Sequence, residues 1–472
     1  MKNVRVIARL DVKGPNVVKG IHLEGLRIVG KPAELARQYY EQGADEILYI
    51  DIVASLYERN NLSNIVQEAI SLGVFVPMTV GGGVRFIEDI RKLLMAGADK
   101  VAINTAATRN PELITNAAKI FGSQCIVGSI EAKRRGNSWE AYVDNGRERT
   151  GLDAVEWAKK LVELGAGELL ITSVDKEGAQ KGYDIELIEK IASQVTVPVI
   201  ASGGAGSNEH VAQCVKSTAC DGIAIGSILH YKKSTIKDIK DELIKQQAAV
   251  RPYSNIIEQK NSAETSPEIS IIDYGIGNIM SVISGFKRIG CTVKVIDTPE
   301  EIAAAHHLVL PGVGAFEDGM RGLKERELTD AIHRHVKANK PLLGICLGSQ
   351  LLMSESEEFG KHKGLDIISG KVIKFTENGI RIPHICWNSV QTNTEWKKTI
   401  FNNMSDNFEA YFIHSYYMVP DDKSKILATT TYGKETFCSA IKMNNVYGCQ
   451  FHPEKSGATG LQILNTFARE VA

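Results

Sequence analysis

The chain lacks long apolar runs, and its cysteines form no framework. No apolar stretch in its 472 residues approaches the length of a membrane span, and the opening MKNVRVIARLDVKG is too short and polar for a signal peptide. The eight cysteines are scattered without a CxxC pair, which argues against a disulfide scaffold and against a zinc site. We therefore expect a cytoplasmic protein with reduced thiols, no metal, no cofactor and no membrane partner.

Excess charge of either sign is also missing. The 55 Lys and Arg residues balance 56 Asp and Glu residues, leaving a formal net charge of −1. Such a balance gives no electrostatic reason to expect a nucleic-acid partner. The hydrophobic fraction of 43% is ordinary for globular proteins, and the length exceeds what one core usually supports. Two or three globular domains are expected.

What the first half does have is a regular alternation of strand-like and helix-like segments. The strand candidates are VRVIARLD, EILYIDI, VPMTVGG, KVAINTA, CIVGSIEA, ELLITSV, VPVIASGG and GIAIGSI. Helical patterns such as IEDIRKLLMAG and GLDAVEWAKKLVELG separate them. This alternation over residues 1–247 predicts a (β/α)8 TIM barrel.

The predicted barrel contains an internal repeat. GADEILYID (43–51) resembles GAGELLITS (165–173), and VPMTVGGGV (76–84) resembles VPVIASGGAG (197–206). A shared strand composition would explain the apolar runs, but it would not explain a nearly constant offset of ~120 residues. The barrel is therefore predicted to consist of two matched halves.

A second domain follows a break in periodicity. Residues 248–268, which contain Pro252 and Pro267, are expected to form a linker. Residues 269–472 open with ISIID and alternate apolar runs with helices, and their last part is rich in strands. This pattern predicts an α/β domain with a mixed sheet.

The second domain contains residue types that suit a cysteine nucleophile. PLLGICLGSQLLM predicts a strand, a sharp turn that exposes Cys346, and a helix whose N-terminus favours the thiolate. Alone, a glycine-flanked cysteine is more often a core residue. GCQFHPEKS adds His452 and Glu454, the base and the orienting acid that such a nucleophile needs. Together they predict a catalytic triad.

These motifs, G-x-C-x-G-x-Q and FHPE, resemble those of the class I glutamine amidotransferases. The resemblance implies that Cys346 attacks the side-chain amide of L-glutamine and releases ammonia, with His452 as base and Glu454 as orienter. It also implies an oxyanion hole and a glutamine pocket. Their residues would be Gly312, Val313, Gly314, Leu347 and Gln350.

The predicted barrel has acids and glycines where TIM-barrel sites lie, at the carboxyl ends of strands. Asp11 ends the first strand and Glu131 ends the fifth, so two repeat-related carboxyls should face each other and suit acid and base roles. Helix caps or loop salt bridges are the alternative. The turns TVGGGV (79–84) and ASGGAGS (201–207) predict one phosphate site in each half, and hence a substrate with two phosphates.

Residues 1–247 resemble the cyclase subunit of imidazole glycerol phosphate synthase, through stretches such as LDVKG, VVKG, ADKVAINTAA and PVIASGGAGS. The second domain resembles the glutaminase subunit of that family, through GIGNI, PGVGAFEDGM and HPEKSG. The resemblance implies that ammonia joins a bis-phosphorylated ribulosyl aminoimidazole carboxamide. The products would be imidazole glycerol phosphate and an aminoimidazole carboxamide ribonucleotide, as in histidine biosynthesis.

The same resemblance implies roles for further residues, with Asp11 as the main acid/base group. Substrate and phosphate contacts would be Lys19, Asp51, Gly82, Gly83, Asn104, Asp175, Gly204, Gly206 and Ser227. A ring of charges that gates ammonia at the closed end of the barrel would be Arg5, Glu46, Lys100 and Glu168. The contact between barrel and glutaminase would involve Asp99 and Lys455.

Two features depart from the histidine enzyme. Its strand-5 acid is an aspartate where this chain has Glu131, and its usual Pro-Cys is missing from IARLD. An added methylene at a reacting group can cost about a hundredfold in rate. One alternative is therefore a diverged copy that supplies ammonia to amidate or amidinate a surface-glycan sugar, with a separate sugar amidotransferase as partner. Another is a non-catalytic barrel that serves as scaffold or conduit. Retained Asp11, Lys19 and both glycine turns favour a working cyclase.

Overall fold

The computed structural model describes residues 3–54, 62–253, 266–276, 278–392, 395–402 and 404–471. The chain separates into two compact units, Met1–Asn255 with Arg381–Cys386, and Ile256–Ile380 with Trp387–Ala472. The boundaries 1–247, 248–268 and 269–472 stay a prediction, and residues 254–265 of the expected linker lie outside the described part. No described helix is both long and apolar enough to cross a membrane.

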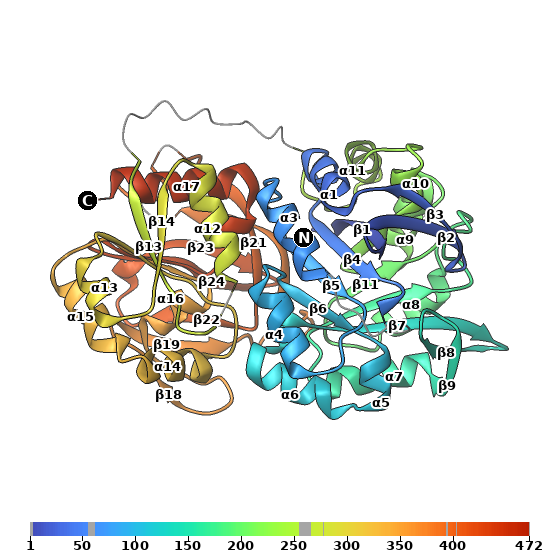
Figure 1. The fold of residues 1–472 in the computed structure, drawn as a ribbon, viewed down its shortest axis with the longest axis horizontal. Helices are drawn as coiled ribbons and strands as arrows, with labels where there is room; N and C mark the ends of the chain where they lie inside the picture. The colour runs from blue at the N-terminus through green and yellow to red at the C-terminus, as the bar shows by residue number, and fades with distance from the viewer. Residues whose placement is uncertain are drawn as a thin grey trace. The chain divides into compact units, whose positions relative to one another are not determined.

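The first unit is a closed barrel of parallel strands, blue to green in Figure 1. Each strand pairs in parallel with the next, and the last returns to the first, so the (β/α)8 prediction is confirmed. All eight predicted runs form these strands. In order around the barrel they are β1 (Arg5–Lys13), β4 (Glu46–Asp51), β5 (Met78–Gly81), β6 (Lys100–Ile103), β7 (Ile126–Arg135), β10 (Glu168–Ser173), β11 (Val199–Ser202) and β12 (Gly222–Ile225).

Helices follow the barrel strands, and several begin at a side chain that caps them. Asp153 accepts bonds from the amides of Val155 and Glu156, and Ser207 accepts one from the amide of His210. The helices are α1 (Pro32–Glu41), α3 (Leu62–Ser71), α4 (Ile87–Met95), α5 (Thr105–Arg109), α6 (Glu112–Phe121), α7 (Ala154–Glu163), α8 (Ile185–Ala192), α9 (Asn208–Ser217), α10 (Ser227–His230) and α11 (Ile236–Lys245).

Two antiparallel excursions extend the barrel at repeat-related places. After β1 come β2 (Asn16–Ile21) and β3 (Glu24–Gly30), and after β7 come β8 (Ser138–Val143) and β9 (Glu148–Asp153). In each case the first excursion strand pairs antiparallel with the barrel strand, and the second pairs with the first. The sequence did not predict these strands. They flank Asp11 in one half and Glu131 in the other, so the repeat extends to the segments around the mouth.

The barrel interior is layered. Its middle layer is a buried apolar cluster of Ile7, Leu48, Ala102, Val127, Leu170, Ile200 and Ala224. Because side chains two positions apart share one face of a strand, Arg5 lies on one side of Ile7, and Arg9 and Asp11 lie on the other. The barrel axis therefore runs from a charged floor, through an apolar layer, to a charged mouth.

The second unit, yellow to red in Figure 1, is built on a mixed sheet, as predicted. Strands β13, β14, β15, β16 and β25 are parallel, and β24, β22 and β19 continue the sheet with antiparallel pairs. The strands are β13 (Glu268–Ile272), β14 (Thr292–Ile296), β15 (His307–Leu310), β16 (Leu342–Ile345), β17 (Met353–Ser356), β18 (His362–Lys363), β19 (Ile368–Lys374), β20 (His384–Thr392), β21 (Asn407–His414), β22 (Tyr416–Pro420), β23 (Ile426–Tyr432), β24 (Glu435–Met443) and β25 (Val446–Cys449).

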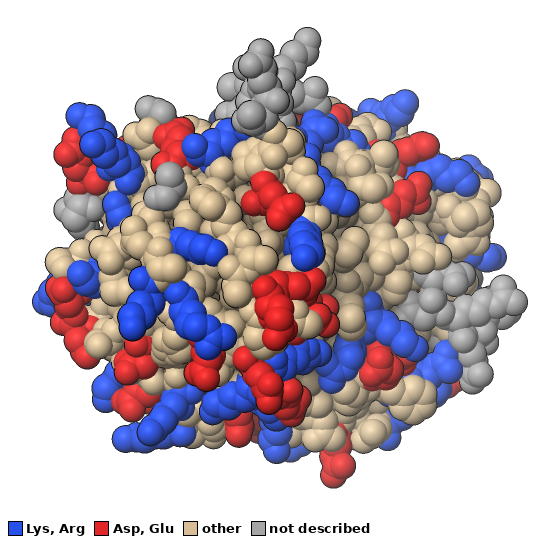
Figure 2. Space-filling view, turned by 60° about the vertical axis from the view of Figure 1, so that its left-hand side comes forward, with Lys and Arg blue, Asp and Glu red and all other residues tan. Residues whose placement is uncertain are grey.

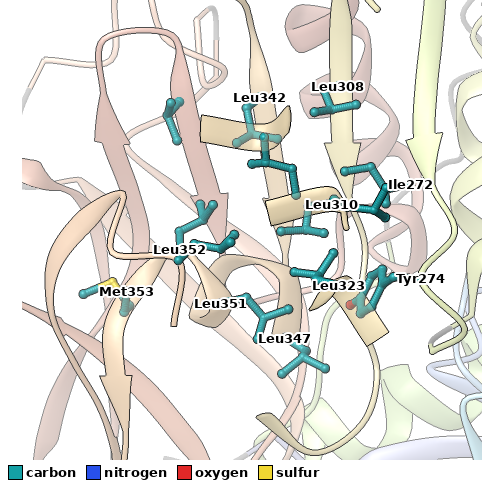
Figure 3. Close-up of a cluster of buried hydrophobic side chains, with 14 of the residues drawn as sticks. Ile272, Tyr274, Leu308, Leu310, Leu323, Leu342, Leu347, Leu351, Leu352 and Met353 are labelled. Atoms are coloured by element: carbon teal, nitrogen blue, oxygen red, sulfur yellow. The ribbon is translucent and has the colours of Figure 1, made fainter. Parts of the chain in front are cut away.

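Helices and a buried apolar cluster complete this unit. The helices are α12 (Ile279–Arg288), α13 (Pro299–Ala304), α14 (Phe316–Glu325), α15 (Leu328–Lys337), α16 (Leu347–Leu351) and α17 (Gly457–Glu470). Figure 3 shows part of the cluster, to which Leu308, Leu310 and Leu342 of the parallel strands and Leu347 and Leu351 of α16 all belong. The short helix α16 is thus packed against the sheet. On the surface, Figure 2 shows basic and acidic side chains interspersed, which agrees with the balanced charge.

Candidate active sites

The two predicted mouth carboxyls lie on opposite sides of the barrel. Asp11 belongs to β1 and Glu131 to β7, and three strands separate β1 from β7 in either direction around the barrel. Both lie in the carboxyl-terminal parts of their strands, where the axis opens into the mouth. The structure thus gives the repeat mates the opposed positions that the sequence predicted. Their surroundings, however, are different.

Asp11 is buried and held by two cations. The Arg9 Nε donates to its Oδ1 at 2.8 Å, and the Lys19 Nζ donates to its Oδ2 at 2.6 Å. Burial alone would raise the pKa of Asp11, but these two cations reverse that effect and hold the pKa well below its usual range. Asp11 is therefore a fixed carboxylate anion.

Arg9 was not among the predicted site residues, although the altered stretch IARLD had drawn attention. Its side chain is buried, and its guanidinium crosses part of the barrel interior to donate to Thr172 Oγ1 at 3.0 Å and to Ser202 Oγ at 2.8 Å. A third group, Glu177 Oε2, lies 3.9 Å away. The signal that could have found Arg9 is strand alternation, which places it on the same face as Asp11.

Lys19 connects Asp11 to a second carboxylate. It lies on β2 and is buried, and besides Asp11 it donates to Glu177, another residue that the sequence did not predict. The amide of His22 also donates to the backbone carbonyl of Glu177 at 2.8 Å. The first excursion is thereby joined to the segment after β10. A Cβ built on Gly226 would lie 3.3 Å from Lys19 Nζ, so Lys19 also reaches the turn before Ser227.

Glu131 has a different environment. The backbone amide of Gly146 donates to its Oε2 at 2.7 Å, and no ion pair to it occurs among the described residues. Burial raises the pKa of Glu131 to about 7, although the Gly146 bond and the charge of Arg9 oppose this, while Asp144 and Asp11 add to it. Near neutral pH Glu131 is therefore protonated in part of the molecules.

A cavity of about 310 Å³ opens beside Glu131. Of the predicted substrate residues, its lining includes Asp51, Gly82, Gly83 and Asn104. It also includes Arg85, Phe86, Arg109 and Asn145, which the sequence did not single out. At Gly82, where φ is +105°, a Cβ would meet the Asp51 carbonyl oxygen at 2.2 Å, so only glycine fits. The first glycine turn thus forms one wall of a cavity next to a predicted acid.

The predicted substrate residues of the other half lie outside the lining of this cavity. Gly204 and Gly206 pack against the backbone of residues 180–182, where a Cβ on either would meet a carbonyl oxygen at 2.2 or 2.0 Å. Asp175 accepts a bond from the amide of Arg134 at 2.8 Å, and Ser227 begins α10. Each half-barrel thus has its own glycine turn at the mouth.

The four predicted gate residues form a closed ring of buried ion pairs. Arg5 contacts Glu46 at 2.6 Å and also Glu168, while Lys100 contacts Glu46 at 2.8 Å and Glu168 at 2.5 Å. All four side chains have no exposed surface. Each acid therefore lies between two cations, and no charge in the ring is left unpaired. As predicted, these are not surface charges; their role as a gate stays a prediction.

In the second unit, Cys346 lies on a strained turn between β16 and α16. Its φ is +50°, a left-handed value that non-glycine residues rarely adopt. The flanking glycines permit the turn, since a Cβ on Gly348 would meet the Leu310 carbonyl oxygen at 1.8 Å, and one on Gly344 would meet the Ser349 Cα at 2.8 Å. The strand, sharp turn and helix of the predicted elbow are thus present. The prediction that the turn exposes Cys346 is wrong, because its side chain is buried.

His452 and Glu454 form the predicted pair. The His452 Nδ1 lies 2.7 Å from Glu454 Oε1, and both side chains are buried. Burial alone would lower the pKa of His452, but the charges of Cys346 and Glu454 raise it well above its ordinary value. A hydrogen bond with the Cys346 side chain also contributes to this rise. The role of His452 as the base that takes the thiol proton stays a prediction.

The oxyanion loop and the glutamine-pocket residue surround the same turn. A Cβ on Gly312 would meet the Leu347 Cβ at 2.8 Å, so the loop of Gly312, Val313 and Gly314 lies against the first residue of α16. The Gln350 side-chain amide donates to the Tyr416 carbonyl at 2.8 Å and to Gln450 at 3.1 Å. Gln450, which was not predicted, in turn lies 3.8 Å from Cys346 Sγ.

Two other predictions remain open. No group of three or more potential metal-ligating side chains occurs in the described ranges. Asp99 accepts a bond from the amide of Met78 at 2.8 Å, and Lys455 is buried. The proposed interface role of Asp99 and Lys455 stays a prediction.

Comparisons with known proteins match the two halves separately. Residues 5–235 match the family described as histidine biosynthesis protein, and residues 270–471 match glutamine amidotransferase class-I. The chain is similar to the imidazole glycerol phosphate synthase subunit HisF of Legionella pneumophila, with 61% identity over 210 residues, covering 44% of this chain and 99% of that protein. Similar subunits from Lactococcus lactis subsp. cremoris and Methanopyrus kandleri are 47% and 48% identical, covering 53% and 52% of this chain and 97% of each relative.

Proposed function

Because this chain belongs to the family of HisF-type cyclases of histidine biosynthesis, with a class-I glutamine amidotransferase domain on the same chain, we propose that it is a bifunctional imidazole glycerol phosphate synthase. It hydrolyses L-glutamine at Cys346 and uses the ammonia to convert a bis-phosphorylated ribulosyl aminoimidazole carboxamide. The products are imidazole glycerol phosphate and an aminoimidazole carboxamide ribonucleotide. The observation that supports this most is the pairing of a complete triad with a two-carboxyl barrel mouth.

The glutaminase step follows from the geometry of the elbow. His452 takes the proton of the Cys346 thiol, and Glu454 at 2.7 Å stabilises the imidazolium that results. The thiolate attacks the carbon of the glutamine side-chain amide. Backbone amides of Val313 and Leu347 stabilise the negative oxygen, and His452 then gives its proton to the amine nitrogen, which leaves as ammonia. Water hydrolyses the thioester to glutamate.

The barrel step uses the residues of the mouth. The glycine turns at Gly82–Gly83 and Gly204–Gly206 offer backbone amides to the two phosphates. Lys19, Asp51, Asn104, Asp175 and Ser227 surround the rest of the substrate. Asp11 and Glu131 lie on opposite sides of the reacting centre. Such a placement suits proton transfers to and from a ring that is closing.

The charged ring at the floor provides the proposed entrance for ammonia. Arg5, Glu46, Lys100 and Glu168 close the axis with paired charges. Because every charge is satisfied within the ring, ammonia passes only when one pair separates. Above the ring the apolar layer admits neutral ammonia more readily than ammonium, since burying an unpaired charge is costly.

The proposal is tested by supplying the purified chain with the bis-phosphorylated acceptor and either glutamine or an ammonium salt. Formation of both products from either nitrogen source is expected. Glutamine hydrolysis without imidazole product from either source would contradict the proposed cyclase and would favour the diverged copy that amidates a glycan sugar.

A further inference from the structure

Arg9 is a residue of the barrel mouth that lies in IARLD, the stretch that lacks the usual Pro-Cys of the histidine enzyme. It is buried in the interior with its guanidinium bonded to Asp11, Thr172 and Ser202. These partners come from β1, β10 and β11, so the guanidinium is fixed from three strands. Burying a cation is costly, and the bonds from Arg9 to Asp11, Thr172 and Ser202 offset that cost.

We propose that Arg9 is a positioning residue that makes Glu131, rather than Asp11, the proton-transferring carboxyl of the barrel mouth. Together with Lys19, Arg9 occupies both oxygens of Asp11 and fixes it as an anion. The inference rests on the proposed cyclase function, and it reverses the role that the family resemblance implies for Asp11.

The contrast between the two carboxyls is geometric. Asp11 has a cation on each oxygen, at 2.8 and 2.6 Å. Glu131 has one backbone amide on Oε2, at 2.7 Å, and borders the cavity that opens at the first glycine turn. A carboxyl needs a free oxygen that faces the substrate to exchange a proton with it. Glu131 meets this condition, whereas both side-chain oxygens of Asp11 accept hydrogen bonds from cations.

The titratable and charged groups near the two carboxyls are Arg9, Lys19, Glu177, Asp144, Arg109 and His230, and Asp51 and Arg85 line the cavity together with Glu131. Arg109 is paired with Asp144 at 2.9 Å, and Lys19 with Glu177, so these partly cancel. Burial lowers the pKa of His230 to about 4, so that ring is neutral at pH 7. Burial raises the pKa of Glu131 to about 7, and Arg9 is the cation that opposes this rise.

A carboxyl that is partly protonated near neutral pH can both give and take a proton. Ammonia adds to the carbonyl carbon of the acceptor, and one proton passes from its nitrogen to the oxygen, which gives a neutral carbinolamine. The carbon–oxygen bond of this carbinolamine then breaks. Glu131 gives its proton to the departing oxygen, which leaves as water. The resulting Glu131 carboxylate takes one proton from the nitrogen, which leaves a carbon–nitrogen double bond. The net change is a carbonyl plus ammonia to an imine plus water, and Glu131 ends as it began.

The inference is tested by following the protonation of Glu131 directly in the full chain. Protein labelled with [5-13C]glutamate is titrated by carbon NMR, and the resonance of Glu131 is identified by its loss in Glu131→Gln. Glu358 serves as an internal control, because burial also raises its pKa to about 7 and it lies in the other unit. Its resonance is identified by Glu358→Gln.

Replacement of the guanidinium by a neutral side chain of similar length, Arg9→Met, removes the cation that lowers the pKa of Glu131. The Glu131 midpoint should rise by about one pH unit, the size expected for the loss of a nearby charge. The Glu358 midpoint should stay where it was, and Arg9→Lys should keep the Glu131 midpoint near its original value. A Glu131 midpoint near the ordinary value of about 4.3 in the original chain, or one unmoved in Arg9→Met, would overturn the inference.

Activity gives a second readout. The pH profile of ammonia-dependent cyclisation, at constant free ammonia, should show an ionisation near pH 7 that Arg9→Met moves upward and Glu131→Gln removes. Glu131→Gln should lower the rate ~10²–10⁴-fold. A profile in which that ionisation survives Glu131→Gln would overturn the inference. If the original chain makes no imidazole product, the proposed function fails, and the NMR titration still decides the role of Arg9.

Discussion

Glu46 and Glu168 are repeat mates on β4 and β10, and each accepts bonds from both Arg5 and Lys100. The duplication thus placed one acid in each half-barrel, while the two cations come from β1 and β6. The positive and negative charges of the ring cancel only when all four side chains are present. Removal of any one leaves a buried charge without its second partner.

The first prediction concerns this ring. Glu168→Gln should lower the free energy of unfolding by about 3–5 kcal/mol, because it leaves Arg5 and Lys100 with a single acid in a buried site. Glu163→Gln is the matched control, since Glu163 pairs with Lys160 on the exposed face of α7 and should cost at most about 1 kcal/mol. Urea unfolding of both variants checks this. Equal losses of unfolding free energy in the two variants would show that the ring stabilises the fold no more than an exposed ion pair does.

A second prediction tests the nucleophile elbow. Gly348→Ala should abolish glutamine hydrolysis, because its Cβ would lie 1.8 Å from the Leu310 carbonyl oxygen and the turn at Cys346 could not form. Gly379→Ala is the control, because nothing lies within 4 Å of its Cβ and its positive φ should cost only about 1 kcal/mol. Glutamate release is measured for both. Normal hydrolysis by Gly348→Ala would contradict the elbow.

The third prediction concerns the pH dependence of the triad. Glu454 raises the pKa of His452, so Glu454→Gln should lower it and disfavour the imidazolium. Because that pKa is raised in the folded chain, the stability that the His452–Glu454 pair contributes is present at low pH and is lost as the pH rises through the folded value. The variant should lose this contribution to stability. Its Cys346 should also react more slowly with iodoacetamide, by about tenfold for each unit by which the pKa of His452 falls. Iodoacetamide kinetics against pH measure this. Unchanged kinetics would argue that Glu454 does not act on His452.

The order of the barrel strands could be predicted from the sequence because each strand is buried on both faces and reads as an apolar run. The excursions could not. Strands β3 and β9 are largely exposed, and ERTGLD has no alternation that distinguishes a strand from a loop. Their pairing depends on β2 and β8, and so on contacts that a local pattern does not contain.

The site could be predicted where a motif and its chemistry coincide, as at Cys346, His452 and Glu454. The state of each mouth carboxyl could not, because it depends on partners far apart in the chain. Arg9 meets Thr172 and Ser202 only after the barrel has closed. Position 9 could still have been placed on the Asp11 face by alternation. That its guanidinium bonds Asp11 required the structure.

The central claim, that one chain couples a glutaminase to a cyclase, is tested most directly by Cys346→Ala. The variant and the original chain are each given the bis-phosphorylated acceptor, once with glutamine and once with ammonium chloride, and imidazole glycerol phosphate is measured. The account predicts that the variant loses product formation from glutamine and keeps the original rate from ammonia. Loss of both activities, or retention of the glutamine-dependent one, would contradict it.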